Sequence, residues 1–331
     1  DVTGYTYTFL TNGQTPVDGW TGLFKKGEKV RLRFINGSAM TFFDVLIPDL
    51  KMTVVAADGQ NIEPVSVDEF RIGVAETYDV IVEPKDDRAY TIFSQDIARS
   101  GFARGTLTPD LSLTAPIPEI DPVPNLGHGD MGMNMMDHAG HDMSAMDHSQ
   151  HQMPGGQMMP GMDHSQHQMP GGQMMPGMDH SQHQMTGTDG MSMKGLKPNP
   201  SDFTAGPVKH APTEYGPHVD MRSDAPQYRL DDPGVGLRNN GRRVLTYADL
   251  KNLRSTHDHR EPDREIELHL TGNMGRYMWS INGVKHADAE PLRWKLGERL
   301  RITFVNDTMM SHPMHLHGMW SDLETGDNNY L

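Results

Sequence analysis

Cysteine is absent from this sequence of 331 residues. The chain therefore has no disulfide framework, no thiolate nucleophile, and no zinc or iron–sulfur site held by cysteine. Any metal ion must be bound by histidine, methionine or carboxylate side chains. Basic residues are also few, because 29 Lys and Arg stand against 44 Asp and Glu and leave a formal charge of −15. A nucleic-acid-binding protein would usually present a basic face, so we expect no nucleic-acid partner.

Long apolar segments are missing as well. No hydrophobic run approaches the roughly 18 residues that a membrane span requires, so we expect no membrane span. The first residue is Asp1, and no basic and apolar leader follows it. We therefore expect that the start of the chain was processed or cut.

The middle of the chain differs from both ends. Residues 105–193 contain ten acidic residues and neither Lys nor Arg, and no aromatic residue lies between Phe102 and Phe203. Without bulky apolar groups to offset the entropy of ordering, this tract is predicted to be a long disordered insert. A 16-residue unit at 146–161 recurs at 162–177 and begins again at 178–185. Because the unit is rich in Gly and Pro, it repeats side-chain chemistry and not a packing module.

Both ends of the chain are predicted to form short β-strands. Apolar and polar residues alternate at 30–34 and again at 266–270 and 300–304, and turn residues bound the β-forming runs at 78–82 and 90–93. No convincing amphipathic helix occurs. The expected fold class is therefore all-β, with β-sandwich or barrel domains.

An internal duplication relates the two ends. Residues 25–36 match residues 295–306 at a constant offset of 270, and the same offset aligns Met40 with Met310. It also places Phe42, Val45 and Ile47 opposite His312, His315 and His317. The first copy is expected to continue as strands to about residue 107, so the last strands of the second copy are expected to lie beyond Leu331.

The strongest candidate metal ligands are His312, His315 and His317. On a strand, His315 and His317 would project from one face, whereas His312 would lie on the opposite face. One strand could then serve two metal centres. Neutral imidazole suits copper, zinc, iron and nickel.

Other histidines give weaker signals. His210 and His286 are isolated in the sequence, and His269 lies in a predicted strand, where a core or surface role is expected more often than metal binding.

The insert is a second candidate metal site. Residues 128–193 contain 17 Met and nine His. Thioether sulfur is soft and selects Cu(I), while imidazole accepts Cu(I) and Cu(II), so the tract is interpreted as a copper-collecting loop rather than an inert low-complexity linker. The candidate ligands in it are Met131, Met133, Met135, Met136, His138, His141, Met143, Met146, His148, His151, Met153, Met158, Met159, Met162, His164, His167, Met169, Met174, Met175, Met178, His180, His183 and Met185.

Several motifs together resemble one family. HPMHLHG, the segments at 57–84 and 306–326, and the Met/His insert look like the periplasmic copper-resistance multicopper oxidases of the copper-resistance protein A family. The resemblance implies cupredoxin-like Greek-key β-sandwich domains. It makes His312 a type 1 copper ligand, His315 a type 2 ligand and His317 a type 3 ligand. Neither an H-W-H-G motif nor an H-C-H motif is present, so the chain is expected to be an incomplete oxidase.

The resemblance also implies a domain arrangement and a function. The expected domains are a cupredoxin-like domain at 1–115, the acidic Met/His-rich linker at 116–210, a connector at 211–262 and a partial cupredoxin-like domain at 263–331. The expected function is oxidation of Cu(I) to Cu(II) with reduction of dioxygen to water in the periplasm. Copper ions, dioxygen and other periplasmic copper-handling proteins are the expected partners.

Two alternatives to the copper-resistance oxidase stay open. One is a non-enzymatic copper sequestration protein, in which the insert binds copper and the β-domains act as a scaffold. The other is a laccase acting on phenols, which has no evident need for 17 clustered methionines. Whether the complete protein is a copper-resistance oxidase or a laccase, the chain alone is expected to be inactive, because a blue-copper centre requires a Cys thiolate.

Overall fold

The computed structural model describes residues 7–132, 208–256, 258–273, 275–276, 278–326 and 329–331. In this part of the chain the protein is nearly all-β, with short 3-10 turns and no α-helix. The predicted fold class is therefore confirmed. No helix among these residues has the length and apolar character needed to cross a membrane. Most of the predicted disordered insert lies outside the described residues.

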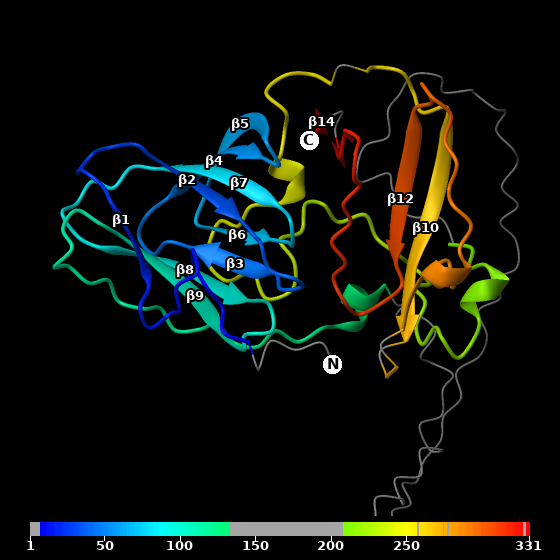
Figure 1. Cartoon of the computed structure of the whole chain (residues 1–331), viewed down its shortest axis with the longest axis horizontal. Helices are drawn as coiled ribbons and strands as arrows, with labels where there is room; N and C mark the ends of the chain where they lie inside the picture. Colours follow the sequence, from blue (N-terminus) through cyan, green and yellow to red (C-terminus); the bar gives the residue numbers. More distant parts are fainter. Residues whose placement is uncertain (1–6, 133–207, 257, 274, 277, 327–328) are drawn as a thin grey trace, which may run out of the picture. The chain divides into compact units, whose positions relative to one another are not determined.

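Nine strands near the N-terminus form two sheets (Figure 1). The five-stranded sheet has the order β1-β9-β8-β3-β6 and the four-stranded sheet the order β2-β7-β4-β5. Pairing is antiparallel except between β1 and β9. The strands are β1 (Trp20–Leu23), β2 (Val30–Ile35), β3 (Phe43–Leu46), β4 (Met52–Ala57), β5 (Gln60–Val67), β6 (Glu69–Ile72), β7 (Thr77–Val82), β8 (Tyr90–Asp96) and β9 (Phe102–Thr108).

One hydrophobic core joins these two sheets. Buried side chains of β3, β6, β8 and β9 belong to the same cluster as those of β4, β5 and β7. The rings of Phe34 and Tyr78 each lie 5.2 Å from the ring of Phe70, which is fully buried. Strands that alternate partly buried and fully buried side chains, such as β7, bury one face against the opposite sheet. The domain is a β-sandwich of the cupredoxin-like type.

The second β-region is smaller. Strand β10 (Arg264–Asn273) pairs in parallel with β12 (Leu300–Asn306) and antiparallel with β11 (Met278–Ile281), and β10 and β12 lie side by side in Figure 1. A two-stranded sheet follows, with β13 (Glu324–Gly326) and β14 (Asn329–Tyr330). The strands predicted around 266–270 and 300–304 are therefore confirmed.

The duplication is visible in hydrogen bonds as well as in sequence. The backbone N–H of Lys25 donates to the Glu28 carboxylate (2.8 Å), and that of Lys295 donates to the Glu298 carboxylate (2.9 Å). The glycine between them has φ +75° in the first copy and +81° in the second, a conformation that favours glycine. Each turn leads into the matching strand, β2 or β12, so the two copies share one turn-and-strand unit.

The unit also ends in the same way in both copies. The Asn36 side-chain oxygen accepts hydrogen bonds from the backbone N–H (3.1 Å) and the hydroxyl (2.7 Å) of Ser38. The Asn306 oxygen accepts the same two bonds from Thr308, at 3.0 and 2.9 Å. This is an Asx turn, in which the side chain replaces a backbone acceptor. The chain therefore leaves β2 and β12 through the same local geometry.

The connector predicted between the β-regions holds the turns η5 (Pro212–Glu214) and η6 (Tyr247–Asp249). Leu245 and Leu250 belong to the hydrophobic core of the first sandwich, and single β-bridges join Val244 to Glu69 and Asn252 to Ile62. This segment is therefore a packed part of the structure and not only a linker. The remaining described turns are η1 (His128–Met131) and η7 (His286–Asp288).

We expect Phe70→Ala to destabilise the protein by about 3–5 kcal/mol, because it leaves a cavity between two aromatic rings in the core. Urea unfolding followed by circular dichroism measures this change. Val17→Ala is the matched control, since Val17 is 86% exposed and its truncation should cost less than about 0.5 kcal/mol. Equal unfolding midpoints for the two variants would contradict the assignment of Phe70 to the core.

Candidate metal centre

The three predicted ligands follow the Asn306 turn, but they do not lie on a strand. Residues 311–316 have no regular secondary structure, and 317–319 form a bend. The prediction that one strand carries His315 and His317 on one face and His312 on the other is therefore wrong. In the first copy the aligned segment does form a strand, β3, with Val45 buried at 2% exposure.

Pairing explains why the two copies differ here. Strand β3 is bonded on both sides, to β6 and to β8. Among the described residues, no strand pairs with the segment at 311–316. A strand obtains its backbone hydrogen bonds from its neighbours, so this segment has no ladder to join.

His312 is held at a half-buried position. Its Nε2 lies 2.7 Å from the Thr308 hydroxyl, and its ring lies edge-on to the Trp279 ring, with a centroid separation of 5.1 Å. Burial lowers the pKa of the His312 imidazole below its ordinary value of 6.5. The ring is therefore neutral at pH 7, which is the protonation state that binds a metal ion.

His315 and His317 form a separate pair. Their ring centroids lie 4.9 Å apart with perpendicular planes, and both side chains are exposed. Imidazoles at this spacing can bind one metal ion or two neighbouring ions. His312 thus packs on Trp279, whereas His315 and His317 contact each other. The division of the three histidines between metal centres stays a prediction.

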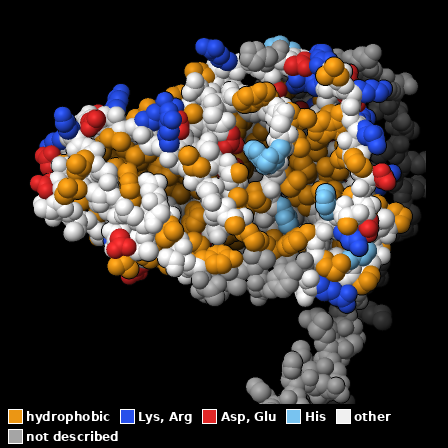
Figure 2. All heavy atoms as spheres, in the orientation of Figure 1, with side chains coloured by type: hydrophobic (Ala, Val, Ile, Leu, Met, Phe, Trp, Pro, Cys, Tyr) orange, Lys and Arg blue, Asp and Glu red, His pale blue; other side chains and the backbone are white. Residues whose placement is uncertain are grey.

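Soft and apolar side chains surround the histidine segment. Met309, Met314 and Met319 are each about half exposed, and Trp320 is 90% exposed. Figure 2 shows histidine side chains at the surface, next to hydrophobic side chains. Thioether sulfur favours Cu(I), so this surface combines the two donor types that suit copper in its two oxidation states.

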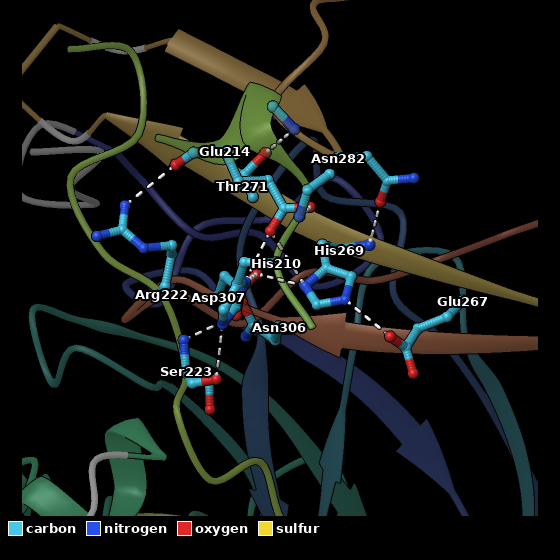
Figure 3. A network of polar contacts seen from close by, with 12 residues as sticks. His210, Glu214, Arg222, Ser223, Glu267, His269, Thr271, Asn282, Asn306 and Asp307 are labelled. Atoms are coloured by element: carbon cyan, nitrogen blue, oxygen red, sulfur yellow. Dashed lines mark hydrogen bonds and ion pairs between the residues drawn. The ribbon is translucent and has the colours of Figure 1, made fainter. Parts of the chain in front are cut away.

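A second cluster, which the sequence did not predict, gathers His210, Glu214, His269 and Asp307 (Figure 3). One ligand atom from each of the four residues lies within 4.8 Å of those of the others. The sequence separates these residues by up to 97 positions, and His210 and His269 were expected to be unremarkable. No local sequence motif predicts this cluster.

Hydrogen bonds hold this cluster together. His210 Nδ1 lies 2.7 Å from the Glu214 carboxylate, and His269 Nδ1 lies 2.8 Å from that of Asp307. Burial lowers the pKa of His269, but its hydrogen bonds with Glu267 and Asp307 and the charge of Glu214 outweigh that effect, so the net pKa is raised above 6.5.

The candidate ligands of the insert are almost all outside the described residues. Of those predicted, only Met131 falls within them, and its backbone belongs to η1. The ligands predicted from Met133 to Met185 stay predictions.

Comparison with known proteins identifies the family. Models described as multicopper oxidase match residues 3–109 and residues 259–330. The chain belongs to the multicopper oxidase family, whose name implies copper as the cofactor. The resemblance drawn from the motifs is thereby confirmed.

The curated relatives narrow this class. Over its whole length the chain is 55% identical to copper resistance protein A of Escherichia coli and 59% identical to copper resistance protein A of Pseudomonas syringae pv. tomato. It covers 53% of each of these proteins, so the chain spans about half the length of the curated relatives it matches. Among solved structures, the laccase from Botrytis aclada matches with 29% identity and a TM-score of 0.28 over 32% of this chain and 21% of that chain.

The histidine donors fit copper, since imidazole binds copper in either oxidation state. The chain lacks cysteine, however, and thus the thiolate of a blue-copper centre. His312, His315 and His317 would therefore supply only part of the donor set of a multicopper oxidase.

In metal-free protein, we expect His312 to titrate below pH 6.5, because burial against Trp279 disfavours the charged ring. Trp279→Ala should raise the pKa of His312 toward 6.5, and the imidazole proton shifts in an NMR titration measure it. Trp320→Ala is the control, since Trp320 is 90% exposed and should leave the titration unchanged. If the Trp279 variant titrates like the control, the packing of His312 on Trp279 does not set its charge.

Proposed function

We propose that this chain is part of a periplasmic copper-resistance multicopper oxidase that oxidises Cu(I) to Cu(II) and reduces dioxygen to water. Two observations support the proposal: the 55–59% identity to copper resistance protein A over the whole chain, and the three histidines of HPMHLHG. Each Cu(I) supplies one electron, so four are oxidised for each dioxygen that takes up four protons and becomes two waters.

The resemblance of HPMHLHG to the family supplies the assignment of roles. His312 would hold the type 1 copper, which accepts single electrons, and its contact with Trp279 partly shields its ring from bulk water. His315 and His317 would hold a type 2 and a type 3 copper, where dioxygen is reduced. Their rings are 4.9 Å apart, close enough to serve neighbouring ions in one cluster.

The sequence position of His312 favours electron transfer between the two proposed copper centres. Only Pro313 and Met314 separate His312 from His315, so a short covalent path joins the proposed electron entry point to the proposed cluster. The donors that complete both centres, including the thiolate, would come from other residues of the complete protein.

The Met/His insert is proposed to collect copper for this oxidase. Its methionines offer ligands for Cu(I), the proposed substrate, and its acidic residues attract cations. Asp130 in η1 pairs with Arg238 (2.6 Å), so the beginning of the tract is attached to the packed connector.

A second candidate function is copper sequestration without catalysis. The 17 methionines and nine histidines of residues 128–193, in a chain without cysteine, favour it. Under this proposal the histidine segment and the insert bind copper, but no electrons reach dioxygen.

The deciding experiment uses the protein expressed from the complete reading frame that contains this segment. We expect it to be blue and to consume dioxygen when Cu(I) is supplied. His312→Ala should abolish the blue colour while the coupled copper cluster stays filled. His317→Ala should keep the blue centre and lower dioxygen consumption by more than the roughly 10–100-fold that loss of an outer-shell partner costs.

His286→Ala is the control, because His286 is exposed and belongs to η7, away from the motif in sequence. Copper content, visible absorption and electron paramagnetic resonance are measured for each variant. Copper binding without dioxygen consumption in the unsubstituted protein would favour sequestration. Loss of the same copper in both histidine variants would refute the division of His312 from His317.

For the insert, we expect removal of residues 133–193 to eliminate most of the Cu(I) bound per chain while the β-sheet circular dichroism is retained. This deletion keeps η1 and the Asp130–Arg238 ion pair. A protein in which a Gly/Ser-rich segment of equal length replaces residues 133–193 should bind as little Cu(I) as the deletion protein. The replacement keeps the length of the chain and removes only the ligands. Cu(I) uptake that is unchanged in both proteins would place the binding in the β-domains.

A further inference from the structure

The cluster of His210, Glu214, His269 and Asp307 connects three segments of the chain. His210 and Glu214 come from the segment at η5, His269 comes from β10, and Asp307 directly follows β12 (Figure 3). All four side chains are buried: His210 is 6% exposed, His269 4%, Glu214 1% and Asp307 0%. Burying two carboxylates is costly unless cations or hydrogen-bond donors compensate for their charge.

The donor atoms have the spacing of a small coordination shell. His210 Nδ1 lies 2.7 Å from Glu214 Oε2 and 3.6 Å from Asp307 Oδ2. His269 Nδ1 lies 3.4 Å from Glu214 Oε2 and 2.8 Å from Asp307 Oδ2. Zinc–nitrogen and zinc–oxygen bonds of about 2.0–2.2 Å in a tetrahedron place neighbouring donors about 3.3 Å apart. Small side-chain shifts therefore bring all four atoms to one ion.

The outer nitrogen of each ring determines where its proton lies. His210 Nε2 faces the backbone carbonyl of Ser223 at 3.2 Å, and His269 Nε2 faces the Glu267 carboxylate at 3.0 Å. Both groups are acceptors, so each Nε2 must carry a hydrogen. A neutral ring then directs the lone pair of Nδ1 toward the carboxylates of Glu214 and Asp307.

Lone pairs of nitrogen and carboxylate oxygen repel each other at 2.7–2.8 Å. A proton, carried by the ring or by the carboxyl group, or a metal ion must therefore lie between each pair of atoms. Arg222 does not supply this charge, because its guanidinium donates to the backbone carbonyl of Glu214 (3.0 Å). Metal-binding histidines typically donate their outer N–H to a carbonyl or carboxylate, which is the arrangement of both rings here.

We propose that His210, Glu214, His269 and Asp307 form a four-coordinate site for a divalent transition-metal ion. The site is distinct from the His312–His317 segment, and the inference does not rest on the proposed oxidase function. Two imidazoles and two carboxylates suit Zn²⁺ or Cu²⁺ and lack the soft sulfur that selects Cu(I). The bound ion would attach the segment that follows the insert to β10 and to the end of β12.

The test measures Zn²⁺ bound per chain by equilibrium dialysis at pH 7 on the full chain. Glu214→Gln and His269→Gln should each lose one equivalent of Zn²⁺ relative to the unsubstituted protein. His286→Gln removes an exposed histidine and should lose none. The insert and the His312–His317 segment are unchanged in all four proteins, so zinc bound there cancels in the comparison. Equal zinc content in all four proteins would overturn the proposal and leave protons, and not a metal ion, between the rings and the carboxyl groups.

A second measurement covers the case in which a variant fails to fold by circular dichroism. Crystals of the unsubstituted protein grown with Zn²⁺ should give an anomalous peak at the zinc edge, within bonding distance of His210, Glu214, His269 and Asp307. Absence of that peak would overturn the proposal. Added Cu²⁺ then compares the two ions, since displacement of the zinc shows tighter copper binding and retention shows tighter zinc binding.

Discussion

The buried carboxylate of Asp307 is the constraint on which the second β-region depends. It accepts a hydrogen bond from the Ser223 backbone N–H (2.8 Å) and lies 2.8 Å from His269 Nδ1, while its own backbone N–H donates to Leu270 (3.0 Å). A charge with no exposed surface must keep these partners, so the connector, β10 and the end of β12 are fixed relative to one another. Thr308 comes next in the chain and bonds His312, so the histidine segment begins from a rigid point.

The two copies of the duplicated unit show how one local geometry serves two purposes. In both copies a glycine turn capped by a glutamate precedes the strand, β2 or β12, and an Asx turn follows it. In the first copy the chain continues into β3, whose neighbours bury Val45 and Ile47 in the core. In the second copy the aligned positions are His315 and His317, and they stay exposed. The fold thus offers a pair of positions that are filled by apolar side chains in one copy and by histidines in the other.

Three donor sets of different chemistry occur along this chain. The insert is rich in thioethers, the HPMHLHG segment presents imidazoles, and the buried cluster combines imidazole with carboxylate. Softer donors favour Cu(I), and harder donors favour divalent ions. In the proposed oxidase, the thioethers of the insert suit the substrate, Cu(I), and the imidazoles of HPMHLHG suit copper in both oxidation states. The buried cluster, by contrast, includes residues of the segment that follows the insert in sequence, and a bound ion would attach that segment to β10 and to the end of β12.

Much of the architecture could be predicted from the sequence, because alternation of apolar and polar residues reports which strand face is buried. Alternation and turn residues indicated the strands β2, β7, β8, β10 and β12. The duplication and the resemblance carried by HPMHLHG came from matching residues and motifs. Alternation does not report which strands become neighbours, so the irregular backbone at 311–316 was missed. The contact of His312 with Trp279 and that of His210 with His269 were decided by tertiary structure alone. Strand β10 pairs with both β11, which carries Trp279, and β12, which precedes His312, and the segment that carries His210 is hydrogen-bonded to β10. No local sequence pattern connects these segments.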